Sequence, residues 1–136
     1  MKKSYNIIGL DYFLMKTDFF QELSIRKLCH HGKGGQSAGI FITILCFLYQ
    51  TGYYLKDNVE LRRKIIHTTD GVFTQEDLQE TIQLALEIGL FHKKLYEEEQ
   101  ILTSREIQEC YLASFPGRKK PAIKTYNLIN HKESEE

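Results

Sequence analysis

The chain lacks a net charge, a disulfide framework and an apolar run long enough to cross a membrane. Its 136 residues include 18 basic and 18 acidic side chains, which argues against a polycation that coats nucleic acid by bulk electrostatics. Three cysteines without a Cys-x-x-Cys pair exclude a disulfide scaffold and a zinc knuckle, and they suit a reducing compartment. The most apolar stretch, residues 39–49, is far shorter than the roughly 20 residues of a membrane span. The amino terminus lacks the apolar segment of a signal peptide, so we expect a cytoplasmic protein with no membrane partner.

The hydrophobic pattern predicts one small, mainly helical domain with a short sheet. Residues 10–22 form an aromatic, extended arm that should pack on the domain, and residues 53–55 have the composition of a short strand. Two apolar runs around a charged link predict a two-stranded hairpin with a long loop over residues 90–103. Helices are predicted over residues 22–31, 36–50, 59–67 and 75–88, with a last helix from a capping box at residues 103–106 to about Ser114.

The helix predicted over residues 75–88 has well-marked ends. Residues 74–77, Thr-Gln-Glu-Asp, have the spacing of a capping box at its start. Gly89 stands where a glycine commonly ends a helix. Leu78 and Ile82 lie four residues apart and predict the inner stripe of this helix.

The order helix, strand, helix, helix, hairpin, helix is that of a winged helix-turn-helix, in which the hairpin is the wing. The expected fold class is therefore mainly α with a small antiparallel β-sheet (α+β), extended by the amino-terminal arm and flanking helices. We assign residues 1–116 to this winged-helix domain. Residues 117–136 are polar and are expected to form a mobile tail.

Several short segments carry a family resemblance when they are taken together. They are Gly-Leu-Asp-Tyr-Phe at 9–13, Thr-Asp-Phe-Phe at 17–20, Ile-Arg-Lys-Leu at 25–28, Tyr-Gln-x-Gly-Tyr-Tyr at 49–54, Gly-Leu-Phe at 89–91, and Ile-Leu-Thr-Ser-x-x-Ile-Gln-x-x-Tyr at 101–111. This set resembles a bacterial and phage family of domains of unknown function, which is grouped with the amino-terminal winged-helix domain of DnaD-like replication proteins. The resemblance covers residues 9–115. It implies a winged-helix fold and a part in phage or mobile-element DNA replication or its control.

The helix over residues 75–88 occupies the place of the recognition helix. In a helix-turn-helix the second helix enters the major groove, and Gln79 and Gln83 on its polar arc could bond adenine edges. The same helix carries four acidic residues and no basic residue, so phosphates would repel it. This charge favours an ordinary solvated face, or a face that binds a partner protein, over base reading.

Basic side chains gather instead on the helix over 59–67, at the start of the predicted hairpin, and in the tail. They could hold phosphates without base specificity. The alternative is a set of solvated charges, and the three glutamates at residues 97–99 weaken the phosphate interpretation at the hairpin. The candidate nucleic-acid contacts are Arg62, Arg63, Lys64, His67, Lys93, Lys94, Arg118, Lys119 and Lys120.

The sequence contains no arrangement that suits catalysis, a metal or a cofactor. Residues 32–37, Gly-Lys-Gly-Gly-Gln-Ser, do not match a phosphate-binding loop, and they follow a predicted helix rather than a strand. Cys29, His30 and His31 stand in a row, but adjacent residues on a helix point about 100° apart and cannot converge on one ion by themselves. We expect no enzyme activity, no metal site and no cofactor.

Two functions from different classes remain open. The first is a DNA-associated accessory protein of phage or mobile-element replication or regulation, which the resemblance and the basic clusters favour. The second is an interaction module that self-associates or docks a replication protein, which the acidic helix and the aromatic arm favour, because Tyr and Phe are enriched in interfaces. Packing of the arm on its own domain is the alternative use of those aromatics.

Overall fold

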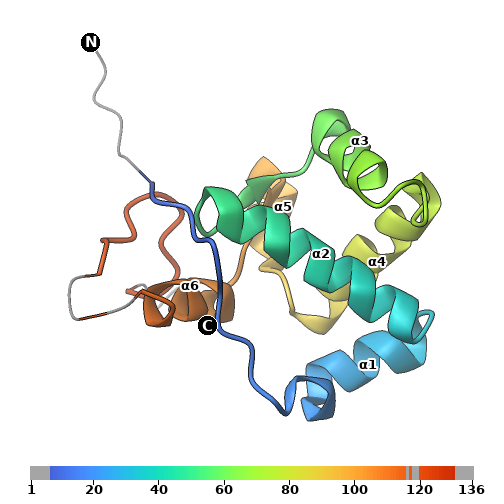
Figure 1. Ribbon diagram of the computed structural model, residues 1–136, viewed down its shortest axis with the longest axis horizontal. Coiled ribbons are helices and arrows are strands. Elements are labelled where there is room, and N and C mark those ends of the chain that lie inside the picture. Colours follow the sequence, from blue (N-terminus) through green and yellow to red (C-terminus); the bar gives the residue numbers. More distant parts are fainter. Residues whose placement is uncertain (1–6, 116, 118–119, 131–136) are drawn as a thin grey trace.

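The computed structural model describes residues 7–115, 117 and 120–130, and it confirms a mainly helical domain with a two-stranded antiparallel sheet (Figure 1). The described residues contain six α-helices and one turn of 3₁₀-helix. No helix within these ranges is long and apolar enough to cross a membrane. In chain order the elements are η1 (Phe19–Gln21), α1 (Leu23–His31), α2 (Gly35–Thr51), β1 (Leu55–Lys56), α3 (Val59–Thr68), α4 (Gln75–Ile88), α5 (Lys93–Glu99), β2 (Ile101–Leu102) and α6 (Arg105–Ala113).

Helix α2 is the centre of the core. It is apolar on nearly all sides, as the sequence predicts, and α1 and α4 both pack against it and against each other (Figure 1). Ile44 and Leu48 of α2 are fully buried, together with Leu28 of α1 and the predicted inner stripe of α4, Leu78 and Ile82. Burying a side chain of this size stabilises the fold by about 1.5–3 kcal/mol.

The predicted ends of α4 are confirmed. The Thr74 hydroxyl accepts a hydrogen bond from the backbone N–H of Asp77, and the Asp77 carboxylate accepts one from the backbone N–H of Thr74. These reciprocal bonds satisfy backbone donors that have no partner inside the helix. At the other end Gly89 takes a left-handed conformation with φ of 100°, which a residue without Cβ adopts at little cost.

The predicted hairpin over residues 90–103 is wrong, because helix α5 occupies its middle. The segment 93–99 consists largely of good helix formers. The Nδ1 atom of His92 accepts a hydrogen bond from the backbone N–H of Leu95 and so caps the first turn. Gln100 ends the helix in a left-handed conformation with φ of 59°. No hairpin, and therefore no hairpin wing, is present among the described residues.

The strand partner of β2 lies far away in the sequence. Leu102 pairs with Leu55, and Ile101 pairs with Lys56, in an antiparallel register. The predicted strand at residues 53–55 is thus displaced toward Leu55–Lys56. This pairing joins the chain before α3 to the chain after α5. Helices α3, α4 and α5 therefore form the segment of sequence that connects the two paired strands.

The start of α6 also differs in detail from the predicted capping box at residues 103–106. Ser104 is the cap, and its hydroxyl accepts from the backbone N–H of Ile107. Thr103 is completely buried, and its hydroxyl donates to the carbonyl oxygen of Tyr53 at 2.6 Å. Thr103 therefore holds the sheet against the core, and it does not cap α6.

The arm packs on the domain, as expected from its aromatic residues. It crosses the carboxy-terminal end of α2 and passes α6 on its way to α1 (Figure 1). The backbone N–H of Leu10 donates to the carbonyl oxygen of Tyr49, and the rings of Phe13 and Tyr49 lie 4.7 Å apart. Gly9 permits this approach, because a Cβ there would overlap the carbonyl oxygen of Gln50.

Residues 120–130 belong to the segment that the sequence assigns to a polar tail. They pack beside α6, and Ile123 joins the core. The buried side chain of Gln108 donates to the carbonyl oxygen of Tyr126 at 2.8 Å and accepts from the backbone N–H of Leu128 at 2.9 Å. These bonds to a buried amide hold a polar segment whose composition is that of a loop. The rest of the predicted tail, apart from Gly117, lies outside the described residues.

Candidate nucleic-acid interface

Helices α3 and α4 form a consecutive pair joined by residues 69–74. The Asn58 side chain caps α3 by accepting from the backbone N–H of Leu61 at 2.8 Å. The connection turns at Asp70 and Gly71, which both have positive φ. The pair thus presents the outer face of α3 and the polar arc of α4 next to each other, and the candidate residues of the sequence can be located on it.

Arg62 of α3 is held in an ion pair rather than facing solvent. Its guanidinium donates from Nε to Oδ1 of Asp57 at 2.9 Å and from Nη2 to Oδ2 at 2.7 Å. Only 11% of the Arg62 side chain and 3% of the Asp57 side chain are exposed. The hydrogen bond with Asp57 raises the pKa of Arg62 further above its usual value. A fork-to-carboxylate pair of this kind leaves little of the guanidinium for a phosphate.

The same ion pair ties α5 to α3. The Tyr96 hydroxyl donates to Oδ2 of Asp57 at 2.7 Å. Burial, and then the hydrogen bond to Asp57, raise the pKa of Tyr96 to about 12. Asp57 and Tyr96 are structural partners that sequence reasoning missed, because the only local signal was an Asp just before α3 that could equally have been its cap.

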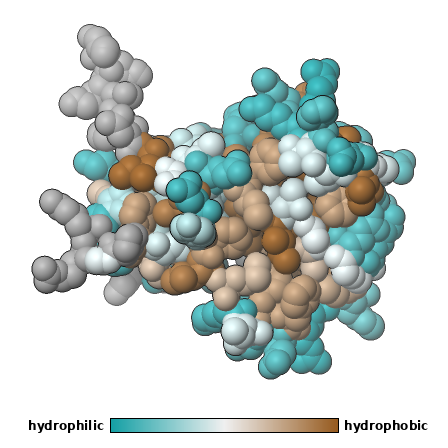
Figure 2. Space-filling model, viewed as in Figure 1, coloured by the Kyte–Doolittle hydropathy of each residue, from teal (hydrophilic) through white to brown (hydrophobic). Residues whose placement is uncertain are grey.

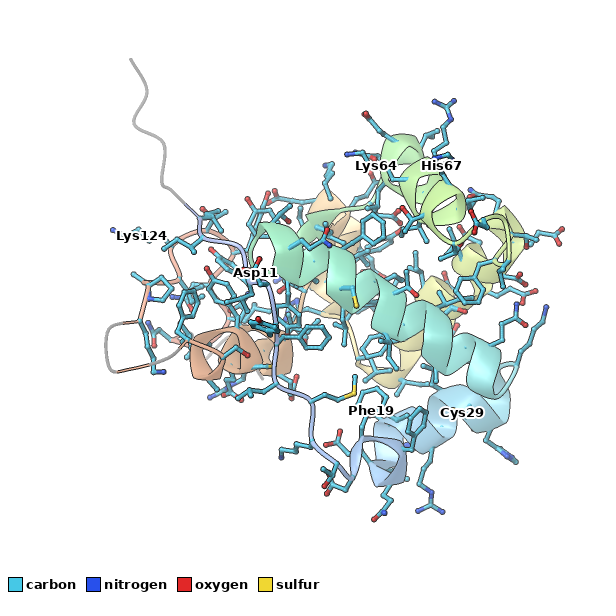
Figure 3. All side chains as sticks on the ribbon, in the orientation of Figure 1. Asp11, Phe19, Cys29, Lys64, His67 and Lys124 are labelled. Atoms are coloured by element: carbon cyan, nitrogen blue, oxygen red, sulfur yellow. The ribbon has the colours of Figure 1, made fainter. Side chains whose placement is uncertain are left out.

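The remaining basic candidates lie in separate places. Arg63, Lys64 and His67 are exposed on α3, and Figure 3 shows Lys64 and His67 on its outer side, at the opposite end of the molecule from Lys124. Lys93 and Lys94 are exposed in the first turn of α5 instead of in a wing. Lys120 donates to the carbonyl oxygen of Leu112 at 2.9 Å, near the end of α6. Arg118 and Lys119 lie outside the described residues. The structure therefore does not join the α3 cluster to the carboxy-terminal segment.

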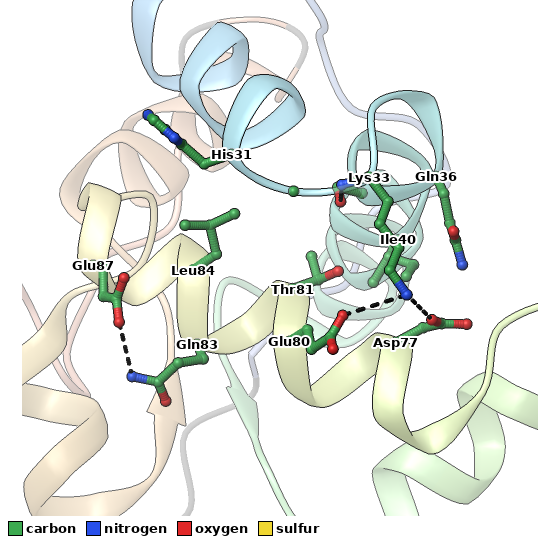
Figure 4. Close-up of a pocket in the computed structure, with 12 residues that line it drawn as sticks. His31, Lys33, Gln36, Ile40, Asp77, Glu80, Thr81, Gln83, Leu84 and Glu87 are labelled. Atoms are coloured by element: carbon green, nitrogen blue, oxygen red, sulfur yellow. Dashed lines mark hydrogen bonds and ion pairs between the residues drawn. The ribbon is translucent and has the colours of Figure 1, made fainter.

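Lys33, in the turn between α1 and α2, faces the acidic residues of α4 (Figure 4). Its Nζ lies 3.4 Å from Oδ1 of Asp77 and 3.5 Å from Oε1 of Glu80. The hydrogen bond to Asp77 raises the pKa of Lys33, and the backbone hydrogen bond from Thr74 lowers the pKa of Asp77. Sequence reasoning missed Lys33, since its partners lie more than forty residues away.

A cavity of about 440 Å³ lies where the α1–α2 turn meets α4. Figure 4 shows His31, Lys33 and Gln36 on one side and residues of α4 on the other. Its wall is mixed in charge, with the Lys33 ammonium beside Asp77 and Glu80 and with Glu87 further along the lining.

The polar arc of α4 has two chemically different edges. Gln75, Gln79 and Gln83 follow each other at intervals of four residues, which places them along one edge of the helix. Nη1 of Arg62 donates to Oε1 of Gln79 at 2.6 Å, so Gln79 on this glutamine edge faces α3, whereas Gln83 lines the cavity. Asp77 and Glu80, which contact Lys33, belong to the edge that faces the α1–α2 turn. Gln83 donates to Oε2 of Glu87 at 3.4 Å, so a glutamine and a carboxylate meet toward the end of α4.

The Cys29-His30-His31 sequence lies at the end of α1. Cys29 is half-buried and the two imidazoles are exposed, with their ring centroids 5.1 Å apart in an edge-to-face arrangement. Across residues 7–115, 117 and 120–130, no group of three or more His, Cys, Asp or Glu side chains is placed to hold a metal ion.

One comparison with known proteins gives a match. The family model described as Lin1244/Lin1753-like, N-terminal, matches residues 12–107. Neither a curated protein nor a solved structure matches the chain. The match confirms the part of the resemblance that points to a family of domains of unknown function, and the DnaD-like relation stays a prediction.

Proposed function

The chain belongs to the Lin1244/Lin1753-like N-terminal family, and from this premise we propose that it is a non-enzymatic, DNA-associated accessory protein of phage or mobile-element replication or regulation. In this proposal α3 and α4 act as the helix-turn-helix of a domain related to the DnaD-like winged helix. The outer face of α3 supplies the phosphate contacts, and the glutamine edge of α4 faces the bases. No chemistry on the nucleic acid is proposed.

The observation that carries the proposal is the place of the glutamine edge beside the basic face of α3. Arg62 links the two helices by bonding Gln79, and Arg63 and Lys64 follow on exposed positions of α3. Asp77 and Glu80, two of the four carboxylates on α4, contact Lys33 on the other edge. Their partial neutralisation reduces the repulsion from phosphates that the sequence of α4 alone implies.

In this proposal the two exposed lysines in the first turn of α5 take the part that the basic residues of a hairpin wing would have. Lys93 and Lys94 stand at the start of α5, and Tyr96 of that helix reaches the Asp57–Arg62 pair at the base of α3. Contacts from such residues would fix the orientation of the domain on the duplex but would not read its sequence.

The proposal is tested by the binding of fluorescent duplex DNA at about 50 mM salt, where phosphate contacts are strong. The double variant Arg63→Ala/Lys64→Ala should weaken binding and lower the slope of log affinity against log salt by about 2, since each lost phosphate contact removes about 1. The control Arg26→Ala/Lys27→Ala removes the same charge from exposed positions on α1. Equal losses in the two double variants, or no binding by the natural chain, would refute the proposal.

The second candidate function is self-association, and the exposed apolar side chains of the arm favour it. Tyr12 is 85% and Leu14 is 60% exposed, and Phe20 and Leu23 are exposed where the arm meets α1. Figure 2 shows apolar residues across the middle of the face that the arm crosses. Apolar patches of this kind commonly mark contact surfaces. Sedimentation equilibrium should show a dimer that Tyr12→Ser/Leu14→Ser dissociates, whereas a monomer at every concentration would remove this candidate.

A further inference from the structure

We infer that Arg62 turns the Gln79 side chain into a fixed hydrogen-bond donor, so that α4 favours guanine at the position that Gln79 faces. This inference rests on the proposed function, since it names the base that the glutamine edge would read. It concerns which end of the Gln79 amide, the donor NH₂ or the acceptor oxygen, faces a ligand. The sequence leaves this open because a free glutamine amide can both donate and accept.

The contact with Arg62 fixes which end of the amide faces α3. A guanidinium has only donors, so the atom that meets Nη1 of Arg62 at 2.6 Å must be the carbonyl oxygen of Gln79. The amide group is planar, and its NH₂ group is therefore the end left for a ligand. Gln79 itself is exposed, so that a ligand can reach it.

Arg62 can hold this orientation because it is itself held. Its two other nitrogens, Nε and Nη2, each donate to the buried carboxylate of Asp57, and that carboxylate also accepts from the Tyr96 hydroxyl. The guanidinium thus has a fixed place between α3, α4 and α5. A fixed guanidinium lets Gln79 meet a ligand in one orientation instead of choosing between two, which lowers the entropy lost on binding.

Gln83, one turn further along the same edge, has the opposite polarity. Its Nε2 donates to Oε2 of Glu87 at 3.4 Å, which directs the amide nitrogen toward that carboxylate. The carbonyl oxygen is then the outward group. The two glutamines form an internal comparison, because they share residue type, helix and edge and differ in what holds them.

A donor at this place distinguishes the bases by their major-groove edges. Guanine presents two acceptors there, O6 and N7, whereas cytosine presents a donor and adenine presents one acceptor beside a donor. The usual glutamine-to-adenine pair needs the glutamine oxygen as acceptor, and in this chain that oxygen already faces Arg62. Guanine therefore fits the fixed amide best, and cytosine fits it worst.

The test is a selection of bound duplexes from a pool with randomised positions, followed by affinity measurements on the enriched duplex and on a non-enriched one. We expect guanine at one enriched position for the natural chain. Gln79→Glu keeps an oxygen facing Arg62 but presents an oxygen outward, so it should lower the preference for that guanine by about tenfold or more. The matched control, Gln21→Glu, adds the same charge at an exposed position in η1, outside α3 and α4, and should leave the guanine preference in place. Thermal unfolding of both variants checks that the fold is kept.

The outcomes distinguish failure of this inference from failure of the proposed function. Loss of the guanine preference in Gln79→Glu alone supports the inference. Salt-dependent binding with no enriched guanine, or with an enriched guanine that survives Gln79→Glu, overturns the inference and leaves the proposed function standing. Absence of binding to any duplex at low salt overturns both.

Discussion

Substitution of Gln108 should release the carboxy-terminal segment from the body of the domain. Gln108 is completely buried on α6, and its amide bonds the carbonyl oxygen of Tyr126 at 2.8 Å and the backbone N–H of Leu128 at 2.9 Å. In Gln108→Ala both backbone groups lose their partner, and the truncated side chain leaves a cavity. Two net hydrogen bonds of about 1 kcal/mol each, together with the cavity, give an expected loss of about 2–4 kcal/mol.

Urea unfolding measures that loss, and hydrogen exchange shows where it occurs. The amide of Leu128 should exchange much faster in Gln108→Ala, while amides inside α2 should change only with global stability. The neighbouring substitution Glu109→Ala is the control, because Glu109 is exposed and its surface pair with Arg105 at 3.3 Å is worth less than about 1 kcal/mol. An unchanged free energy of unfolding together with an unchanged Leu128 exchange rate would refute the reasoning.

Three further perturbations address other parts of the molecule. Tyr96→Phe removes a hydrogen bond to the buried Asp57 carboxylate and should cost about 1.5–3 kcal/mol in urea unfolding. Because the folded pKa of Tyr96 is raised from 10.0 to about 12, the natural chain should also lose stability between these pH values, and the variant should lack that contribution. Thr74→Ala removes the cap of α4 and should cost about 1 kcal/mol. The lowered pKa of Asp77 gives stability that is present above the unfolded pKa of this group and is lost as the pH falls through its folded pKa. Acid titration of the free energy of unfolding, for Thr74→Ala beside the natural chain, measures this contribution. Gly9→Ala places a Cβ against the carbonyl oxygen of Gln50 and should free the arm, seen as faster exchange of the Leu10 amide; an arm that stays protected would contradict this.

Local patterns in the sequence predict the helices that are stabilised locally. The capping residues Thr74 and Asp77, the terminal Gly89, and the buried spacing of Leu78 and Ile82 all act within α4, so its predicted bounds agree with the structure. The same reasoning succeeds for α1 and α2, whose apolar patterns continue over two or more turns.

Helix α5 has local support in its good helix formers and its His92 cap, but its charge order opposes the helix and other stabilising contacts are distant in sequence. Lysines begin it and glutamates end it, an order that opposes the helix dipole and so destabilises the isolated segment. The compensating bond from Tyr96 goes to Asp57, thirty-nine residues earlier. The strand after it likewise pairs with residues 55–56 rather than with its own neighbours. The hairpin prediction follows the two apolar runs on either side of the charged link and overlooks the helix-forming residues within it.

The candidate interface shows the same limit for charge. When charged residues are counted helix by helix from the sequence, α4 is acidic and Arg62 is one of three equivalent cations on α3. In the folded chain Lys33 reaches across from another turn to two of the α4 carboxylates, and Asp57 occupies Arg62. The charge that a ligand meets on α3 and α4 is what remains after these pairings. It is less negative on α4 and less positive on α3 than the count from the sequence. Arg62 is lost as a phosphate contact but becomes the residue that orients Gln79, because a guanidinium anchored on one side can direct the group on its other side.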